Sequence, residues 1–241
     1  MKIRYLLSIL LSLLIMNQTL AKDIKSDSFK TKDGRKVTVH FIQHASFYLT
    51  FDGLTIYADP VKYEGVDYST LPKADIILIT HDHYDHLDKE AVSDIMTPTT
   101  VIYGSKYALE VIKTGIVLRN GEKSSFKNII TIEAVPAYNT TEGRESYHPK
   151  GRDNGYIITL GGSRIYIPGD CEDMPEMKQF KPIDVAFFPI NQPYTMTVEQ
   201  AINAAKIIKP KILYPIHYSD TDLTGLSVLK KAKIDVRIFK M

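Results

Sequence analysis

The distribution of apolar residues predicts a chain built mainly of short strands from residue 36 onward. Alternating or continuous apolar runs rich in valine, isoleucine, tyrosine and phenylalanine are typical of strands, and the dipeptide Asp52-Gly53 is typical of a hairpin turn. We expect strands at residues 37–42, 46–51, 54–58, 75–80, 100–104, 129–137, 155–160, 163–168, 184–189 and 211–216. Residues 75–80 form a continuous apolar run, as in a strand covered on both faces.

Four segments have helical spacing instead, at residues 89–96, 106–114, 197–208 and 225–233. In the third of these, Thr197 is a candidate N-cap and the apolar positions share one face. Each half of the chain therefore opens with hairpins and continues with alternating strands and helices. This order predicts an α/β fold with two mixed sheets packed face to face and helices outside, a four-layer αββα sandwich.

The N-terminal residues 1–21 have a different pattern. Lys2 and Arg4 precede an apolar run at residues 5–16, and a small residue, Ala21, precedes the expected cut. These features are typical of a secretory signal peptide. The alternative is a retained anchor, but the run is shorter than the roughly 20 residues of a bilayer span. We expect one domain at residues 22–241, exported to a periplasm or outside the cell, with no stable membrane anchor after cleavage.

The charge balance and the cysteine count limit the partners and the covalent links that we expect. The chain has 30 basic and 28 acidic residues, and removing residues 1–21 takes away two basic residues and no acid. A neutral mature chain argues against broad electrostatic binding of nucleic acid. The single cysteine, Cys171, excludes an intramolecular disulfide. The sequence leaves open the role of Cys171 and the formation of a homo-oligomer.

The strongest chemical signal is the segment "THDHYDHLD", which directly follows the apolar run at residues 75–80. His81 and His83 project to the same side of an extended chain, and Asp85 and His86 follow the bend. Imidazole and carboxylate groups suit zinc and its neighbours. Four such ligands exceed what one open tetrahedral site needs, so we expect two metal ions. The alternative is a solvated polar loop.

Further ligands are expected from other strand ends. Asp170 follows a strand through Gly169 and is placed to bridge two cations, and His217 follows the strand at 211–216. His148 lies in a polar loop, where Asn139 is a polar candidate nearer to a strand. The alternatives are a turn aspartate and packed or surface histidines.

These motifs resemble the metallo-β-lactamase superfamily. "THDHYDHLD" is similar to its metal-binding signature, "IYIPGD" to its later aspartate motif and "YPIHY" to its terminal histidine motif. The flanking stretches "QHASFYLTFDGLTIYADP", "HPKG" and "NQPYTMTVEQA" look more like the lactonase-like and phospholipase-D-like hydrolases than like the antibiotic-destroying enzymes. The resemblance covers nearly all of residues 22–241 and implies the αββα fold.

The resemblance also implies a set of ligands and a reaction. One metal would be held by His81, His83 and His148, the other by Asp85, His86 and His217, with Asp170 bridging them. The expected metal is zinc, with manganese or iron as alternatives. A hydroxide bridging the metals would attack a small-molecule or lipid-like ester, lactone, phosphoester or phosphodiester.

Several further residues are candidates for catalysis or substrate contact. Asp85 is the expected acid/base residue, and His44 would contact substrate or transfer a proton, or would be an ordinary turn histidine. Asn191, Tyr194 and Tyr218 would donate to a developing oxyanion, or would pack. Three aspartates are expected to support the site or the fold. Asp59 would fix a ligand histidine or a turn. Asp82 would orient a neighbouring residue, and Asp88 would cap a helix.

Two rival functions remain consistent with the motifs. A true β-lactamase would fit export, but the flanking motifs fit it less well. A di-iron redox protein would usually carry a glutamate in the first motif and a flavin-binding partner domain, whereas Asp82 stands between His81 and His83 and residues 22–241 leave no room for that domain.

Overall fold

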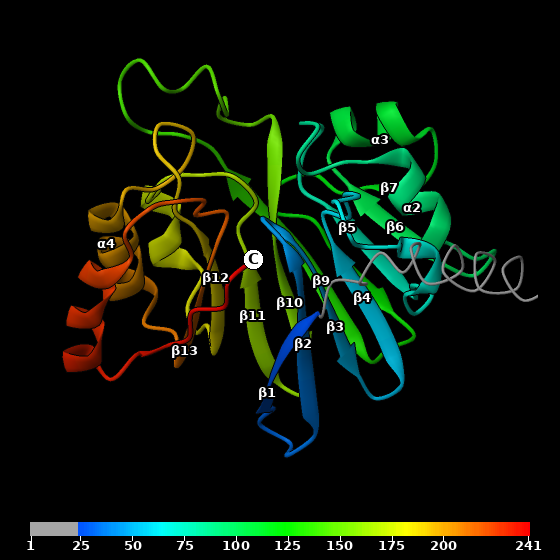
Figure 1. Cartoon of the computed structure of the whole chain (residues 1–241), viewed down its shortest axis with the longest axis horizontal. Helices are drawn as coiled ribbons and strands as arrows, with labels where there is room; N and C mark the ends of the chain where they lie inside the picture. The colour runs from blue at the N-terminus through cyan, green and yellow to red at the C-terminus, as the bar shows by residue number, and fades with distance from the viewer. Residues whose placement is uncertain (1–23) are drawn as a thin grey trace, which may run out of the picture.

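The computed structural model describes residues 24–241, and these residues form two seven-stranded mixed sheets packed face to face (Figure 1). The predicted signal segment, residues 1–21, lies outside the described residues. The first sheet contains β1 (Lys25–Lys30), β2 (Lys36–Gln43), β3 (Ser46–Phe51), β4 (Leu54–Ala58), β5 (Ile76–Ile79), β6 (Val101–Gly104) and β7 (Ile116–Val117). The second contains β8 (Lys123–Phe126), β9 (Ile130–Ala137), β10 (Asp153–Leu160), β11 (Ser163–Ile167), β12 (Val185–Pro189), β13 (Ile212–Ile216) and β14 (Asp235–Val236).

Both sheets follow the same plan. In each, four strands pair antiparallel and the next three pair parallel. Short hairpins join the antiparallel strands, except for the long loop of residues 138–152 between β9 and β10. The predicted turn at Asp52-Gly53 joins β3 to β4, and both residues have positive φ (54° and 77°), as a two-residue hairpin of type I′ requires. The hairpins therefore build the antiparallel half of each sheet locally.

The helices cover the outer faces of the two sheets. The α-helices are α2 (Lys89–Ile95), α3 (Lys106–Ile112) and α4 (Val198–Ile208), and the 3-10 helices are η1 (Tyr68–Thr70), η2 (Pro175–Gln179) and η3 (Thr224–Ala232). The α2 and α3 helices pack on the first sheet, and α4 and η3 on the second (Figure 1). The predicted four-layer αββα arrangement is confirmed.

The main core lies between the sheets. Along β5, Ile76 and Leu78 face the opposite sheet, while Ile77 and Ile79 face the helices. Phe47 of the first sheet stacks on Phe187 of the second, with ring centroids 4.2 Å apart. Burial on both faces explains why this strand reads as a continuous apolar run.

Two helix starts were visible in the sequence and are confirmed. The Asp88 carboxylate accepts from the backbone N–H groups of Glu90 and Ala91 at the start of α2. Thr197 caps α4 and forms a reciprocal capping box with Gln200.

Four strands were not predicted: β1, β7, β8 and β14, each at the edge of a sheet. β1 has the polar sequence KSDSFK and pairs only with β2 at the edge of the first sheet. β7 has two residues and β8 reads KSSF. Edge strands bury little apolar surface, so their side chains carry no strong periodic signal.

Hydrogen bonds join the two sheets at the edge where β5, β11 and β13 end. The Tyr156 hydroxyl of β10 donates to the carbonyl of Ile79 at 2.8 Å. The backbone N–H of Asn154 donates to the carbonyl of Thr80 at 3.1 Å. These bonds hold the polar segments that follow the strands in a fixed relation.

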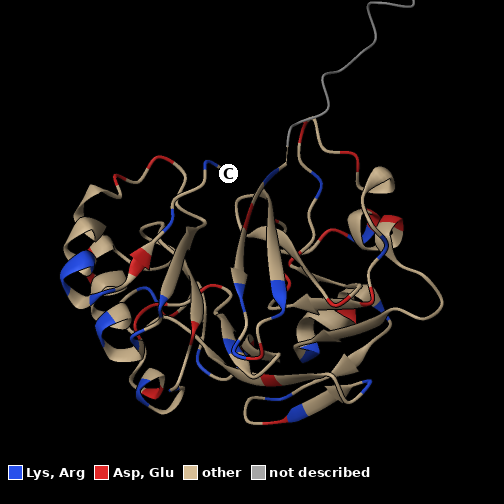
Figure 2. Cartoon of the chain, turned by 90° about the horizontal axis from the view of Figure 1, so that it is seen from below, with Lys and Arg blue, Asp and Glu red and all other residues tan. Residues whose placement is uncertain are grey.

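The exterior carries interspersed charges of both signs along its helices and loops (Figure 2). Within residues 24–241, every helix falls short of the length and apolar character needed to cross a bilayer.

Candidate active site

Six of the seven histidines in the chain meet where the two sheets are joined. They come from the turn after β2 (His44), the loop after β5, the loop between β9 and β10 (His148) and the end of β13 (His217). The seventh, His40, instead stacks on Tyr48 with ring centroids 4.3 Å apart. Four of the six line a cavity of about 640 Å³: His44, His83, His148 and His217.

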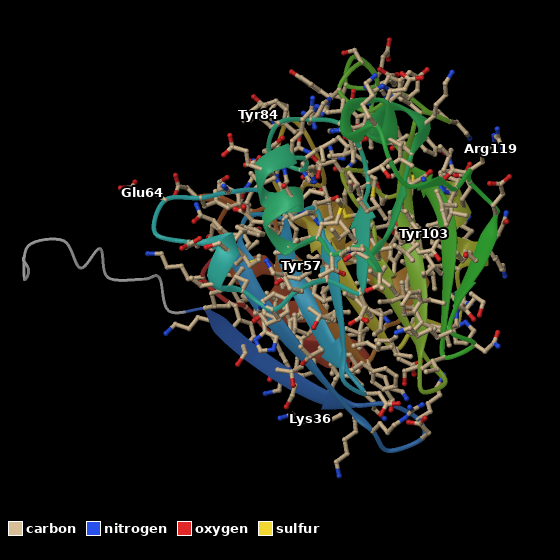
Figure 3. The ribbon with its side chains drawn as sticks, turned by 90° about the vertical axis from the view of Figure 1, so that its right-hand side faces the viewer. Lys36, Tyr57, Glu64, Tyr84, Tyr103 and Arg119 are labelled. Atoms are coloured by element: carbon tan, nitrogen blue, oxygen red, sulfur yellow. The ribbon has the colours of Figure 1, made fainter. Side chains whose placement is uncertain are left out.

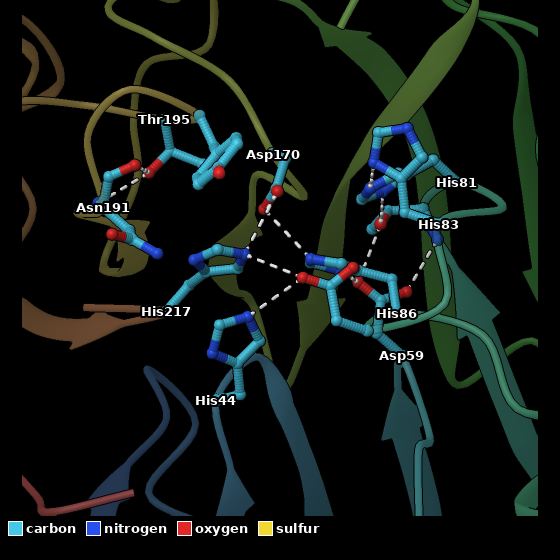
Figure 4. A network of polar contacts seen from close by, with 12 residues as sticks. His44, Asp59, His81, His83, His86, Asp170, Asn191, Thr195 and His217 are labelled. Atoms are coloured by element: carbon cyan, nitrogen blue, oxygen red, sulfur yellow. Dashed lines mark hydrogen bonds and ion pairs between the residues drawn. The ribbon is translucent and has the colours of Figure 1, made fainter. Parts of the chain in front are cut away.

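The predicted ligands form two groups. The ligand atoms of His81, His83 and His148 lie within 4.8 Å of one another, and so do those of His44, Asp85, His86 and His217. This grouping matches the two half-sites that the resemblance implies, with His44 added to the second (Figure 4).

Asp170 lies between the two groups. Its Oδ1 is 3.2 Å from Nε2 of His86, and its Oδ2 is 3.2 Å from Nε2 of His217 and 3.4 Å from Nε2 of His148. Gly169 makes this position possible, because its φ of +65° turns the chain directly after β11. One carboxylate therefore reaches both groups of histidines.

Several of these buried atoms lack hydrogen-bond partners. They are Nε2 of His86, His148 and His217 and Oδ1 of Asp170, whose mutual contacts have ion-pair distances without hydrogen-bond geometry. Leaving a buried polar group unpaired costs about 1–3 kcal/mol. Imidazole nitrogen and carboxylate oxygen are the donors that zinc and related cations take, so this donor set fits bound metal.

Burial and neighbouring charges shift the pKa values of the site histidines in opposite directions. Burial lowers the pKa of His148 to about 4, with neighbouring imidazoles adding to the effect. Burial alone would also lower the pKa of His217, but the carboxylates of Asp170 and Asp85 outweigh it and raise that pKa to about 9. Burial opposes ionisation of Asp170, yet His217 and His86 hold the pKa of this carboxyl well below its usual value.

Hydrogen bonds to Nδ1 aim three imidazoles at the cavity. Asp59 Oδ2 accepts from Nδ1 of His86 at 2.8 Å and from the Thr80 hydroxyl at 2.7 Å. Since that hydroxyl donates to Asp59, it accepts from Nδ1 of His81 at 2.9 Å. Nδ1 of His148 donates to the carbonyl of Tyr194 at 3.2 Å. In each ring Nε2 is left to face the other ligands, an arrangement common in metal sites.

His44 and Asp85, which follow β2 and β5 of the first sheet, contact each other and His217 of the second sheet. Nε2 of His44 is 3.2 Å from Oδ2 of Asp85, which lies 3.6 Å from Nε2 of His217. The backbone N–H of His217 donates to the carbonyl of His44 at 2.8 Å. Both histidines have positive φ (61° and 48°), a strained conformation that is often found at functional sites.

The structure brings two of the three predicted substrate-contacting residues to the cavity. Asn191 and Tyr194 line it, but Tyr218 does not. The positive φ of His217 reverses the chain there, and the Tyr218 hydroxyl donates to the carbonyl of Phe239 at 2.6 Å. Tyr218 instead lines an adjoining cavity with His44 and His217, and its contact with substrate stays a prediction.

Other candidates lie outside the ligand cluster. Asn139 donates through Nδ2 to the carbonyl of Tyr194 at 2.8 Å, so it supports the loop. Asp82 lines the cavity and accepts from Arg152 at 2.6 Å instead of orienting a histidine. Cys171 is buried in the apolar layer beneath α4, and burial raises the pKa of its thiol, which does not favour a metal-ligating thiolate.

Sequence reasoning missed a buried anchor for the loop that carries His148. Glu172 is fully buried, and its Oε2 accepts from the backbone N–H groups of Thr140 (2.7 Å) and Thr141 (2.6 Å). Arg144 of the same loop donates to Gln192 and so links it to the loop after β12. The only sequence signal was the position of Glu172, two residues after Asp170. Tyr84, Tyr147 and Ser219 also line the cavity and were not predicted.

Comparison with known proteins agrees with this geometry. A family model described as a beta-lactamase superfamily domain matches residues 38–217. A UPF0173 metal-dependent hydrolase from Methanosphaera stadtmanae is 31% identical over 196 residues, covering 75% of this chain and 83% of that relative. The crystal structure of a proposed metal-dependent hydrolase from Parabacteroides distasonis is 52% identical to this chain in sequence. The two structures match with a TM-score of 0.88, and the match covers 91% of this chain and 100% of that one. Igni18, a metallo hydrolase from Ignicoccus hospitalis, shares the fold at 24% identity and a TM-score of 0.70, covering 84% and 94% of the two chains.

Proposed function

The chain belongs to the beta-lactamase superfamily and is a metal-dependent hydrolase, and we propose that it uses two divalent cations to cleave an ester, lactone, phosphoester or phosphodiester bond. The observation that carries this proposal is the position of Asp170 between two groups of histidines, with unpaired buried atoms facing it from both groups. A single carboxylate contacting both groups is the arrangement that a dinuclear site needs.

The donor set suggests which residues hold each ion. His81, His83 and His148 would hold one ion, and Asp85, His86 and His217 the other, with Asp170 contacting both. Nitrogen and oxygen donors favour zinc, with manganese or iron as alternatives. When bound, such ions lower the pKa of water and polarise the oxygen of the scissile bond.

Asp85 and His44 are the proposed proton-handling pair. Burial opposes ionisation of Asp85, but His217 and His44 outweigh it and hold the pKa of this carboxyl well below its usual value. Burial lowers the pKa of His44, and Asp85 only partly offsets this effect. A neutral His44 whose Nε2 faces Asp85 is able to take up a proton and pass it to a leaving group.

Metal analysis tests the proposal directly. Purified protein loaded with zinc should contain about two ions per chain, and Asp170→Ala should lose at least one ion together with turnover of ester and phosphodiester substrates. The matched control is Asp173→Ala, since Asp173 lies on the same loop and accepts from Asn203 instead of facing the histidines. Full turnover in chelator-treated protein would refute the proposal, and an iron absorption band without hydrolysis would favour a redox protein.

We also propose that the protein is exported. The support is the basic start and apolar run of residues 1–21. When the full chain is expressed in bacteria and the cells are fractionated, the protein should leave the cytoplasm and begin at Lys22 by N-terminal sequencing. Cytoplasmic protein that retains residues 1–21 would contradict this proposal.

A further inference from the structure

Exposed tyrosines gather at the mouth of the cavity. Among the described residues, the exposed tyrosines are Tyr84, Tyr107, Tyr147 and Tyr194, and three of these four line the cavity. The fourth, Tyr107, lies outside it. Figure 3 shows Tyr84 at the surface, whereas Tyr57 and Tyr103 lie within the buried layers. Aromatic rings left exposed together around one opening are characteristic of a binding surface.

Three separate loops supply these rings. Tyr84 comes from the loop after β5, Tyr147 from the loop between β9 and β10, and Tyr194 from the loop after β12. The rings of Tyr147 and Tyr194 meet edge to face with centroids 5.1 Å apart. Tyr84 is 88% exposed, so it has the most apolar surface to lose when a ligand covers it.

The loops that carry Tyr147 and Tyr194 are held in place. Asn139 donates to the carbonyl of Tyr194, and Arg144 donates to Gln192. The backbone of Thr140 and Thr141 is fixed by the buried Glu172 carboxylate. The aromatic pair is therefore preformed, which reduces the entropy lost when it binds a ligand.

Away from its floor, the cavity offers no cation to an anionic group. Of the described residues that line it, none is a lysine or an arginine, and the histidines among them belong to the two groups of candidate ligands. The nearby Arg152 is occupied, because it donates to Asp82 at 2.6 Å and to Asp153 at 2.7 Å. The mouth of the cavity therefore gives a negatively charged part of a substrate no cationic partner.

We propose that the substrate is an uncharged ester or lactone whose aromatic or extended apolar group lies against Tyr84, Tyr147 and Tyr194. This inference rests on the proposed function, because it places the scissile bond at the histidine cluster. The floor residues His148, Asp170 and His217 are buried, whereas the tyrosines are exposed at the mouth. A cavity of about 640 Å³ accommodates both ends of such a molecule.

The reaction is a simple hydrolysis. The oxygen of water bonds to the acyl carbon, and the bond from that carbon to the ester oxygen breaks. The departing alkoxide takes one proton from the water, giving an acid and an alcohol. No further reactant is needed.

The test compares three substrates with zinc-loaded protein. Methyl phenylacetate carries an apolar ring, methyl acetate lacks it, and methyl phenyl phosphate carries the ring on an anionic diester. We expect kcat/KM to be at least about tenfold higher for methyl phenylacetate than for methyl acetate. Preference for methyl phenyl phosphate over methyl phenylacetate would overturn the proposal.

Single-residue variants then show which tyrosine rings contact the apolar group of the substrate. Tyr147→Ala and Tyr194→Ala should each raise KM for methyl phenylacetate roughly three- to tenfold more than they raise KM for methyl acetate. The corresponding Phe variants should behave like the parent, because the ring and not the hydroxyl makes the contact. Tyr107→Ala, at an exposed tyrosine outside the cavity, is the control. Equal KM values in the Ala variants and the parent would overturn the proposal.

A binding measurement separates this inference from the proposed function. Saturation-transfer NMR with 2-phenylethanol on chelator-treated protein should detect binding that the double variant Tyr147→Ala/Tyr194→Ala loses. Tyrosine-dependent binding without turnover of any ester, lactone, phosphoester or phosphodiester would support the aromatic subsite and refute the proposed function. Ester turnover that does not depend on these rings, together with no binding of the probe, would refute the subsite and leave the hydrolase proposal standing.

Discussion

Asp59 determines how His86 faces the cavity. It adopts a positive φ of 43°, and its carboxylate accepts three hydrogen bonds, from the backbone and side chain of Thr80 and from Nδ1 of His86. Because Thr80 also accepts from His81, this one carboxylate orients residues of both metal-binding groups.

We expect Asp59→Asn to weaken zinc binding by about 10- to 100-fold, because the amide offers one acceptor oxygen where the carboxylate offers two. Zinc affinity measured by competition with a chromogenic chelator checks this. Asp75→Asn is the matched control, since Asp75 also accepts from a backbone N–H, that of Thr55, but far from the histidines. Equal losses in both variants would show a general destabilisation and no orienting role.

Asp153 predicts a pH dependence of stability. Burial raises its pKa to about 7, although Arg152 partly opposes the shift. Between the unfolded pKa of about 3.9 and the folded pKa of about 7, the folded chain binds one more proton than the unfolded chain at this site. The contribution of Asp153 to stability is therefore present at low pH and is lost as pH rises toward 7.

From roughly pH 5 to pH 7, the free energy of unfolding of chelator-treated protein should accordingly decrease relative to that of the Asp153→Asn variant. Urea unfolding at stepped pH measures this difference, in which the titration of the site histidines cancels. Asp82→Asn should move the step to lower pH, because Asp82 raises the pKa of Asp153. Parallel curves for the parent and Asp153→Asn would contradict the assignment.

A site residue could be predicted when the residues next to it in the sequence indicated its role. His81, His83, Asp85 and His86 follow a buried strand within one short segment, and the strand-end rule found Asp170 and His217. His148 was preferred over Asn139 only through a family resemblance. Tyr147 gave no local signal, and Glu172 gave only its position two residues after Asp170, because the roles of both depend on how two loops pack against each other.

At the scale of elements, the site depends on close contact between the ends of β5 and β11. A Cβ on Gly169 would lie 2.8 Å from Cβ of Thr80 and 2.9 Å from the carbonyl oxygen of Asn154. Thr80 precedes His81, and Gly169 precedes Asp170. The absence of a side chain at Gly169 thus sets the separation between the first motif and the Asp170 carboxylate.

Gly169→Ala should therefore separate Asp170 from the histidines and lower both zinc content and turnover at least about tenfold, since small displacements in such a site are costly. Its φ of +65° adds strain of about 1–2 kcal/mol for any L side chain. Gly53→Ala shares a positive φ of +77° but has no atom within 4 Å of the added Cβ, so it controls for strain alone. Metal loss of equal size in both variants would contradict the contact argument.

Elements with strong periodic signals were predicted and those at edges were not. The strands that carry the site, β5, β11 and β13, are buried on both faces and read as apolar runs in the sequence. β1 and β8 are polar because they lie at sheet edges, so only pairing with a neighbour defines them. Both strands pair with the next strand in a hairpin, but a short polar edge strand shows too little apolar periodicity to be recognised from sequence.

At the scale of the whole molecule, the C-terminal segment ties the two sheets together. Arg237 donates to Asp27 of β1 at 2.8 Å, and Tyr214 of β13 donates to the same carboxylate at 2.9 Å. Phe239 stacks on Phe41 of β2 with ring centroids 4.5 Å apart. The segment that follows the second sheet therefore packs on the first.

Phe239→Ala should lower the free energy of unfolding by about 2 kcal/mol, less than for a fully buried phenylalanine because Phe239 is only partly buried. The neighbouring Ile238 is 52% exposed, and Ile238→Ala should change stability by less than about 0.5 kcal/mol. Zinc content should stay unchanged in both variants, because the Tyr218 hydroxyl contacts only the backbone carbonyl of residue 239, which alanine retains. Urea unfolding with parallel metal analysis measures both quantities. Loss of zinc in Phe239→Ala would mean that the stacking contact also fixes His217, so that sheet closure and the site form one cooperative unit.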